Sequence, residues 1–201
     1  MASEDEAKEF VKSLALCEKA PSSFFDTTQN GKDMWDRVYE ICGGNIGLLE
    51  RCAGHAMDMG GSWEKGLLWV SRDLEGAVKR GLRPKAFPTR GSSRSPAAWT
   101  KENYKTVLRE LALAKKHFPQ LQHHAVSLDK LEDAVGEEAL RSMVEWNLVA
   151  VRRKSEWAKD LPQKVFTDLD DDKVVVMPSP AELYFVLKMY EAGKLDAAPE
   201  K

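Results

Sequence analysis

The 201-residue sequence has few cysteines and no long hydrophobic run. Its three cysteines, Cys17, Cys42 and Cys52, are odd in number and irregularly spaced. They predict buried free thiols in a reducing compartment, not a disulfide framework. No apolar stretch approaches the ~18 residues that a membrane span requires. The polar, acidic start from Met1 to Glu6 is unlike a secretory signal or a transit peptide. We therefore expect an intracellular protein, in the cytosol, nucleus or an organelle interior, with no membrane partner.

The sequence also lacks the motifs on which most nucleotide, metal and nucleophile sites depend. The glycines of residues 43–47 are not followed by the Lys-Ser/Thr of a P-loop, and no GxGxxG or GxSxG occurs. The acidic run 168–172 lacks the EF-hand glycine and glutamate, and the four histidines have no metal-ligand spacing. We therefore expect no catalytic residue, no metal and no cofactor. An enzyme with a site between two domains remains the third alternative.

Composition and charge predict a globular chain with two parts. Hydrophobic residues make up 43% and charged residues 31%, with a formal net charge of −2, so the chain as a whole is not disordered. Residues 82–99 differ: they hold four basic residues, no acid, three prolines and four Ser or Thr, with no helical or strand period. This composition predicts a linker. We expect a flexible tail at residues 193–201.

The predicted first domain, residues 1–81, is all-helical. Ser3 begins a capping box, and apolar residues then recur at intervals of three and four. Asp33, Asn45 and Ser62 are predicted to cap the three helices that follow, which glycine pairs separate. Four helices joined by short turns indicate a compact bundle.

The predicted second domain, residues 100–192, changes period along its length. Three helices come first, and a β-branched strand is predicted at 148–153. A long polar loop leads to a second strand at 173–177 and a last helix. This order is that of a winged helix with a two-stranded wing, whose loop we expect Trp157 and Phe166 to order in part. The fold class is therefore mainly α, a four-helix bundle followed by a winged-helix (α/β) domain.

Basic residues gather in two stretches that can meet phosphate groups. One is the acid-free run from Lys79 to Lys101, which contains the linker, and the other follows the first predicted strand into the wing. The candidate nucleic-acid-binding residues are Arg83, Lys85, Arg90, Arg94, Arg141, Arg152, Arg153, Lys154, Lys159 and Lys164.

The helix predicted at 137–146 favours a protein partner instead. It begins with two glutamates and holds Glu145, and Arg141 is its only basic residue. Carboxylates on a helix that enters the major groove face repulsion from DNA phosphates. The candidate protein-binding residues are Glu137, Glu138, Arg141, Glu145 and Trp157.

One segment carries a family resemblance. In Tyr39–Leu49 (YEICGGNIGLL) a helix ends in paired glycines and Asn45 starts the next helix. This pattern resembles the helical lid of AAA+-related P-loop ATPases of the archaeal and STAND type, in which a winged helix follows the lid. The resemblance implies the lid and winged-helix region without the nucleotide-binding core, since the Walker lysine is absent. In that family the lid closes over nucleotide, and the winged helix binds DNA or regulates the ATPase.

The leading hypothesis is therefore a non-catalytic protein that works by binding another macromolecule. A protein partner, or an ATPase core that the chain regulates, is expected to dock through the helical bundle or the helix at 137–146. The alternative is DNA binding through the winged helix and the basic linker.

Overall fold

The computed structural model describes residues 3–25, 29–87, 96–117, 124–154, 165–167 and 172–196. The chain forms two compact units, Met1–Gly76 and Ala77–Lys201. The fold is mainly helical with one small antiparallel sheet. In the part of the chain that is described, no helix is long and apolar enough to cross a lipid bilayer.

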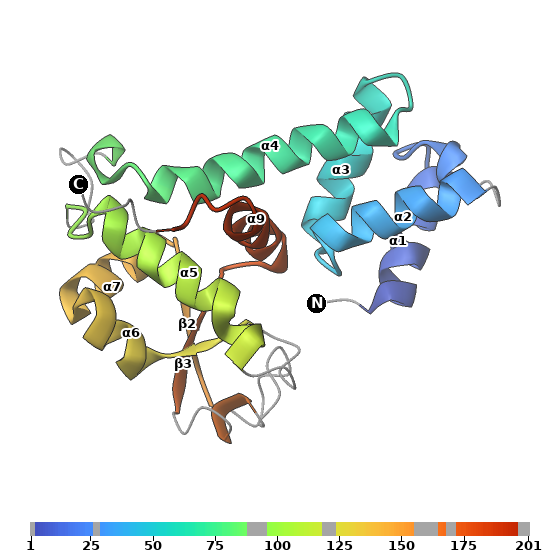
Figure 1. The fold of residues 1–201 in the computed structure, drawn as a ribbon. Helices are drawn as coiled ribbons and strands as arrows, with labels where there is room; N and C mark the ends of the chain where they lie inside the picture. The colour runs from blue at the N-terminus through green and yellow to red at the C-terminus, as the bar shows by residue number, and fades with distance from the viewer. Residues whose placement is uncertain are drawn as a thin grey trace. The chain divides into compact units, whose positions relative to one another are not determined.

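Helices build the first unit (Figure 1). Ser3 accepts a hydrogen bond from the Glu6 backbone N–H, and the Glu6 carboxylate accepts one from the Ser3 N–H, so the capping box is confirmed. Asn45 caps the third helix by accepting from the Leu48 N–H at 3.2 Å, also as predicted. The elements are α1 (Glu4–Leu16), a 3-10 turn η1 (Ser22–Phe25), α2 (Gln29–Cys42), α3 (Ile46–Asp58) and α4 (Trp63–Gly81), whose last turns belong to the second unit.

Two predictions for the first unit are corrected. The second helix starts at Gln29, four residues before Asp33, so Asp33 lies inside the helix and is not its cap. Cys42 and Cys52 are buried, but Cys17, the first residue after α1, is exposed.

Helices and a small sheet build the second unit, and polar caps again start its helices. Thr100 and Ser127 accept hydrogen bonds from the N–H groups three residues on, and Ser179 does the same for Glu182. The elements are η2 (Pro84–Ala86), α5 (Lys101–His117), β1 (Val126–Ser127), α6 (Leu128–Val135), α7 (Glu137–Glu145), β2 (Ala150–Arg153), β3 (Lys173–Val176) and α9 (Pro180–Glu191).

The sheet has the strand order β1-β3-β2, with both pairings antiparallel. Val175 of β3 lies opposite Val126 on one side and Val151 on the other. The sequence predicted β2 and β3 but not β1, whose two residues are too few to show a period. α5 packs against α6, α9 and β1, so helices and sheet share one core (Figure 1).

Residues predicted to form a linker belong to the second unit. That unit begins at Ala77, and Trp99 is buried in its core, where the indole N–H donates to the Gly81 carbonyl at 2.9 Å. Phe87 packs against the same core, whereas residues 88–95 lie outside the described residues. Packing of Phe87 and Trp99 thus fixes the described part of the predicted linker against the core of the second unit.

The loop predicted to be a wing and the predicted tail are each described only in part. Phe166 is buried in a small cluster with Ala125, Val165 and Val174, as predicted for that side chain, whereas Trp157 lies outside the described residues. Leu195 is buried in the main core, so the expected flexibility is wrong for the described residues 193–196, and residues 197–201 lie outside the described residues.

Candidate functional site

The exposed face of α7 holds the predicted protein-binding residues that the structure describes. Ala139, Leu140, Ser142 and Met143 turn toward the core and are buried. Because apolar residues occupy that face, the charged ones lie on the other, and all are exposed: Glu137, Glu138, Arg141 and Glu145. The fifth candidate, Trp157, lies outside the described residues. The face therefore carries three carboxylates and one guanidinium.

The predicted wing cations are only partly described. Arg152, Arg153 and Lys154 follow one another at the end of β2, and all three are exposed. Hydrogen bonds fix the backbone of these three residues, because β2 pairs with β3 and the Lys154 N–H donates to the Asp172 carbonyl at 2.8 Å. The remaining wing candidates, Lys159 and Lys164, and the linker candidates Arg90 and Arg94 lie outside the described residues.

The two described linker candidates, Lys85 and Arg83, lie in different surroundings. Lys85 is exposed within η2. Arg83 lines a hollow of about 440 Å³ in the second unit, which we name the basic hollow. Its lining residues are Lys79, Leu82, Arg83, Lys101, Lys105, Met189 and Lys194.

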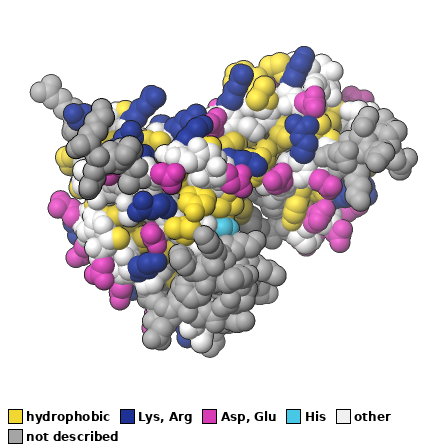
Figure 2. All heavy atoms as spheres, viewed as in Figure 1, with side chains coloured by type: hydrophobic (Ala, Val, Ile, Leu, Met, Phe, Trp, Pro, Cys, Tyr) yellow, Lys and Arg dark blue, Asp and Glu magenta, His cyan; other side chains and the backbone are white. Residues whose placement is uncertain are grey.

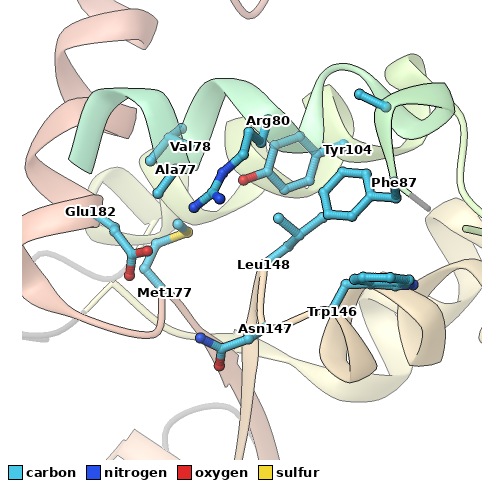
Figure 3. A pocket seen from close by; sticks show the side chains of 11 residues that line it. Ala77, Val78, Arg80, Phe87, Tyr104, Trp146, Asn147, Leu148, Met177 and Glu182 are labelled. Atoms are coloured by element: carbon cyan, nitrogen blue, oxygen red, sulfur yellow. The ribbon is translucent and has the colours of Figure 1, made fainter. Parts of the chain in front are cut away.

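A second cavity, the Tyr104 pocket, has a volume of about 360 Å³ (Figure 3). This volume is within the range of small-molecule sites. It is lined by the end of α4, η2, the start of α5, the turn after α7 and the residues around the start of α9. The lining residues are Ala77, Val78, Arg80, Ala86, Phe87, Tyr104, Trp146, Asn147, Leu148, Met177 and Glu182.

Three polar groups set the electrostatics of the Tyr104 pocket. Burial raises the pKa of Glu182, although hydrogen bonds from Ser179 and the charge of Arg80 act in the opposite direction. Burial, with a smaller effect from Glu182, also raises the pKa of Tyr104. The Tyr104 hydroxyl is buried without a hydrogen-bond partner among the described atoms, which carries a desolvation cost.

Aromatic rings form the other wall of this pocket. Phe87 meets Trp99 and Trp146 edge-on, with ring centroids 5.1 and 4.9 Å apart. Asn147 follows with a positive φ of 56°, a conformation that asparagine tolerates better than most residues. The pocket thus offers a cation, a carboxyl, an amide and apolar surface, a set suited to binding a small polar group.

Sequence reasoning found this pocket only in part. Arg80 belongs to the acid-free run from Lys79 to Lys101, so a signal for one member was present. Tyr104 reads as an ordinary core residue, and Glu182 as a helix-start residue. Their convergence depends on long-range packing that no local pattern encodes.

His124, one of the four histidines, lies in the interior of the second unit. His124 is buried, and its Nδ1 lies 2.9 Å from the Leu111 carbonyl oxygen. Within the described ranges, no group of three His, Cys, Asp or Glu residues is placed to hold a metal ion.

A scan against protein-family models, a search of curated proteins and a search of solved structures found no match to this chain.

Proposed function

We propose that this chain is a non-catalytic binding protein, in which a lid-like helical bundle precedes a winged helix that docks onto a protein partner. The order α5, β1, α6, α7, β2, β3 and the strand order β1-β3-β2 support the winged-helix assignment. In this assignment α7 occupies the place of the recognition helix.

The exposed charge of α7 is the observation that carries the proposal. A helix presenting Glu137, Glu138 and Glu145 repels a phosphate backbone, and it attracts a surface rich in Lys and Arg. The family resemblance implies an ATPase core as this partner, and a chain that regulates such a core has no need of its own Walker lysine.

A short Lys-rich helical peptide with a fluorescent label is the probe that tests this face. We expect it to bind the chain at low salt, and the triple variant E137Q/E138Q/E145Q to bind about tenfold less tightly, a change of ~1.4 kcal/mol. The matched control removes three exposed carboxylates from the first unit, Glu9, Glu40 and Glu50, also as Gln variants. Equal weakening in both variants, or turnover of ATP by the purified chain, contradicts the proposal.

Nucleic-acid binding is the second candidate, favoured by the three consecutive exposed cations at the end of β2. Arg152, Arg153 and Lys154 are exposed cations that can each contact a phosphate group, with Arg152 and Arg153 on opposite faces of β2. If they do, affinity for a short DNA duplex falls steeply with salt, and R152Q/R153Q lowers the slope of log K against log salt by about 2. A flat salt titration excludes this candidate.

A further inference from the structure

The basic hollow concentrates positive charge from three separate segments of the chain. Lys79 lies in the last turn of α4 and Arg83 two residues beyond its end, before η2. Lys101 and Lys105 come from the start of α5, and Lys194 from the turn after α9. Among its described lining residues there are five cations and no carboxylate side chain; the other two are Leu82 and Met189. Figure 2 shows Lys and Arg side chains gathered over this end of α4 and along α5.

Helix stability explains only part of this arrangement. Lys79 lies in the last turn of α4, where the helix dipole favours cations. Lys101 and Lys105 lie in the first and second turns of α5, where the same dipole disfavours cations. The α5 pair therefore adds positive charge next to backbone N–H groups that are already positive.

Lys105 is the most buried of these cations. Its side chain is only 14% exposed, and its Nζ donates to the Asp196 carbonyl at 3.1 Å. The Glu102 carboxylate is 3.9 Å away and mostly exposed, so it compensates the ammonium weakly. Arg83 and Lys194 have no ion pair with any other described residue. The other four cations are exposed, so the cluster is an accessible concentration of positive charge that a multivalent anion can reach from solvent.

We propose that the basic hollow binds a small polyphosphate, such as inorganic tripolyphosphate or an inositol polyphosphate. The five cations come from three segments of the chain and line a space of about 440 Å³, which suits a compact anion carrying several charges. A nucleic-acid backbone instead needs cations strung along its path. Arg83 can take a phosphate in bidentate fashion while the lysines act as point charges. This site lies apart from α7 and does not depend on the function proposed above.

Calorimetric titration of the full chain with tripolyphosphate and inositol hexakisphosphate tests the site. We expect both to bind at low salt and to raise the midpoint of thermal unfolding. The variant K101Q/K194Q is expected to weaken both at least tenfold. These two side chains are exposed, so their loss leaves the core intact.

The matched control is K130Q/K188Q, which removes two exposed lysines from the same unit without touching the hollow. It is expected to bind both compounds as the unaltered chain does. If both double variants bind the two compounds more weakly to the same extent, the compounds are attracted by the overall charge of the chain, and the proposal is overturned. It is also overturned if neither compound binds the unaltered chain. Tighter binding of a single-stranded oligonucleotide than of either compound, lost in K101Q/K194Q, assigns the hollow to nucleic acid and also overturns it.

Discussion

Single residues with close neighbours show where the second unit tolerates no change. Gly81 is such a residue: a Cβ atom at this position would lie 2.3 Å from Cε1 of the Tyr104 ring. The Gly81 carbonyl also accepts the Trp99 indole N–H. Gly81 therefore lies between two buried aromatic side chains, and glycine is required here for its lack of volume.

The substitution G81A is expected to destabilise the chain by about 1–3 kcal/mol, because the added methyl group overpacks the core. G76A is the matched control on the same helix, since nothing lies within 4 Å of a Cβ at that position. It is expected to stabilise by about 0.5–1 kcal/mol through higher helix propensity. Urea unfolding measures both, and similar effects of the two substitutions would contradict the packing argument.

Glu182 gives a prediction with a definite pH dependence. Burial raises the pKa of Glu182 in the folded chain above the ordinary value of 4.5. The protonated carboxyl group therefore stabilises the folded state at pH values below 4.5, and this stabilisation is lost as pH rises through the pKa of the folded state. E182Q keeps an acceptor for Ser179 and removes the charge. We expect E182Q to be the more stable form near pH 7 and the difference to close near pH 4 in urea unfolding. A difference independent of pH would show that burial of the charge is not its cause.

At the scale of helices and strands, local sequence patterns predict where most helices begin. Helix starts at Ser3, Asn45 and Ser62 follow from cap residues, and the structure has hydrogen bonds from the expected N–H groups to each of them. Local patterns fail where tertiary contacts decide. The strand β1 exists because β3 lies beside it, and α2 begins earlier than its apolar period suggests.

The cap at Asn45 is directly testable. N45A removes the acceptor for the Leu48 N–H and is expected to cost about 1 kcal/mol of stability. N45D retains an acceptor oxygen and is expected to cost little. The two variants are compared by urea unfolding, and an equal loss in both would mean that Asn45 acts through something other than its cap.

At the scale of the whole molecule, the sequence separated two units, but the structure draws the division at Gly76 and not after residue 81. The composition of residues 82–99 predicts a linker because most of them are polar. It does not show that two aromatic residues among them, Phe87 and Trp99, pack against the core of the second unit. For the same reason the basic run was visible in the sequence, whereas the hollow it helps to form was not. Lys105 and Lys194 join it only through packing of α5 and α9.

Both units contain a buried acid whose pKa is raised. A hydrogen bond with Cys42 and burial raise the pKa of Cys52, and burial raises that of Tyr104. In the unfolded chain these groups ionise near their ordinary values of 9.0 and 10.0, so above about pH 9 the unfolded state holds fewer protons than the folded one. The free energy of unfolding is therefore expected to fall as pH rises from 9.

Urea unfolding between about pH 8 and 11 measures this fall. C52A and Y104F are expected to make it shallower, because each removes one group that ionises more readily in the unfolded chain. Y184F, which alters a half-buried tyrosine outside the Tyr104 pocket, serves as the control. An unchanged slope in C52A and Y104F would contradict the assignment.

The unequal burial of the three cysteines has a practical consequence. Cys42 and Cys52 are enclosed, whereas Cys17 stands in solvent just past the end of α1. A maleimide dye added to the folded protein will therefore attach at one place without any engineered substitution. Such a tag gives the first unit its own optical reporter for following partner association.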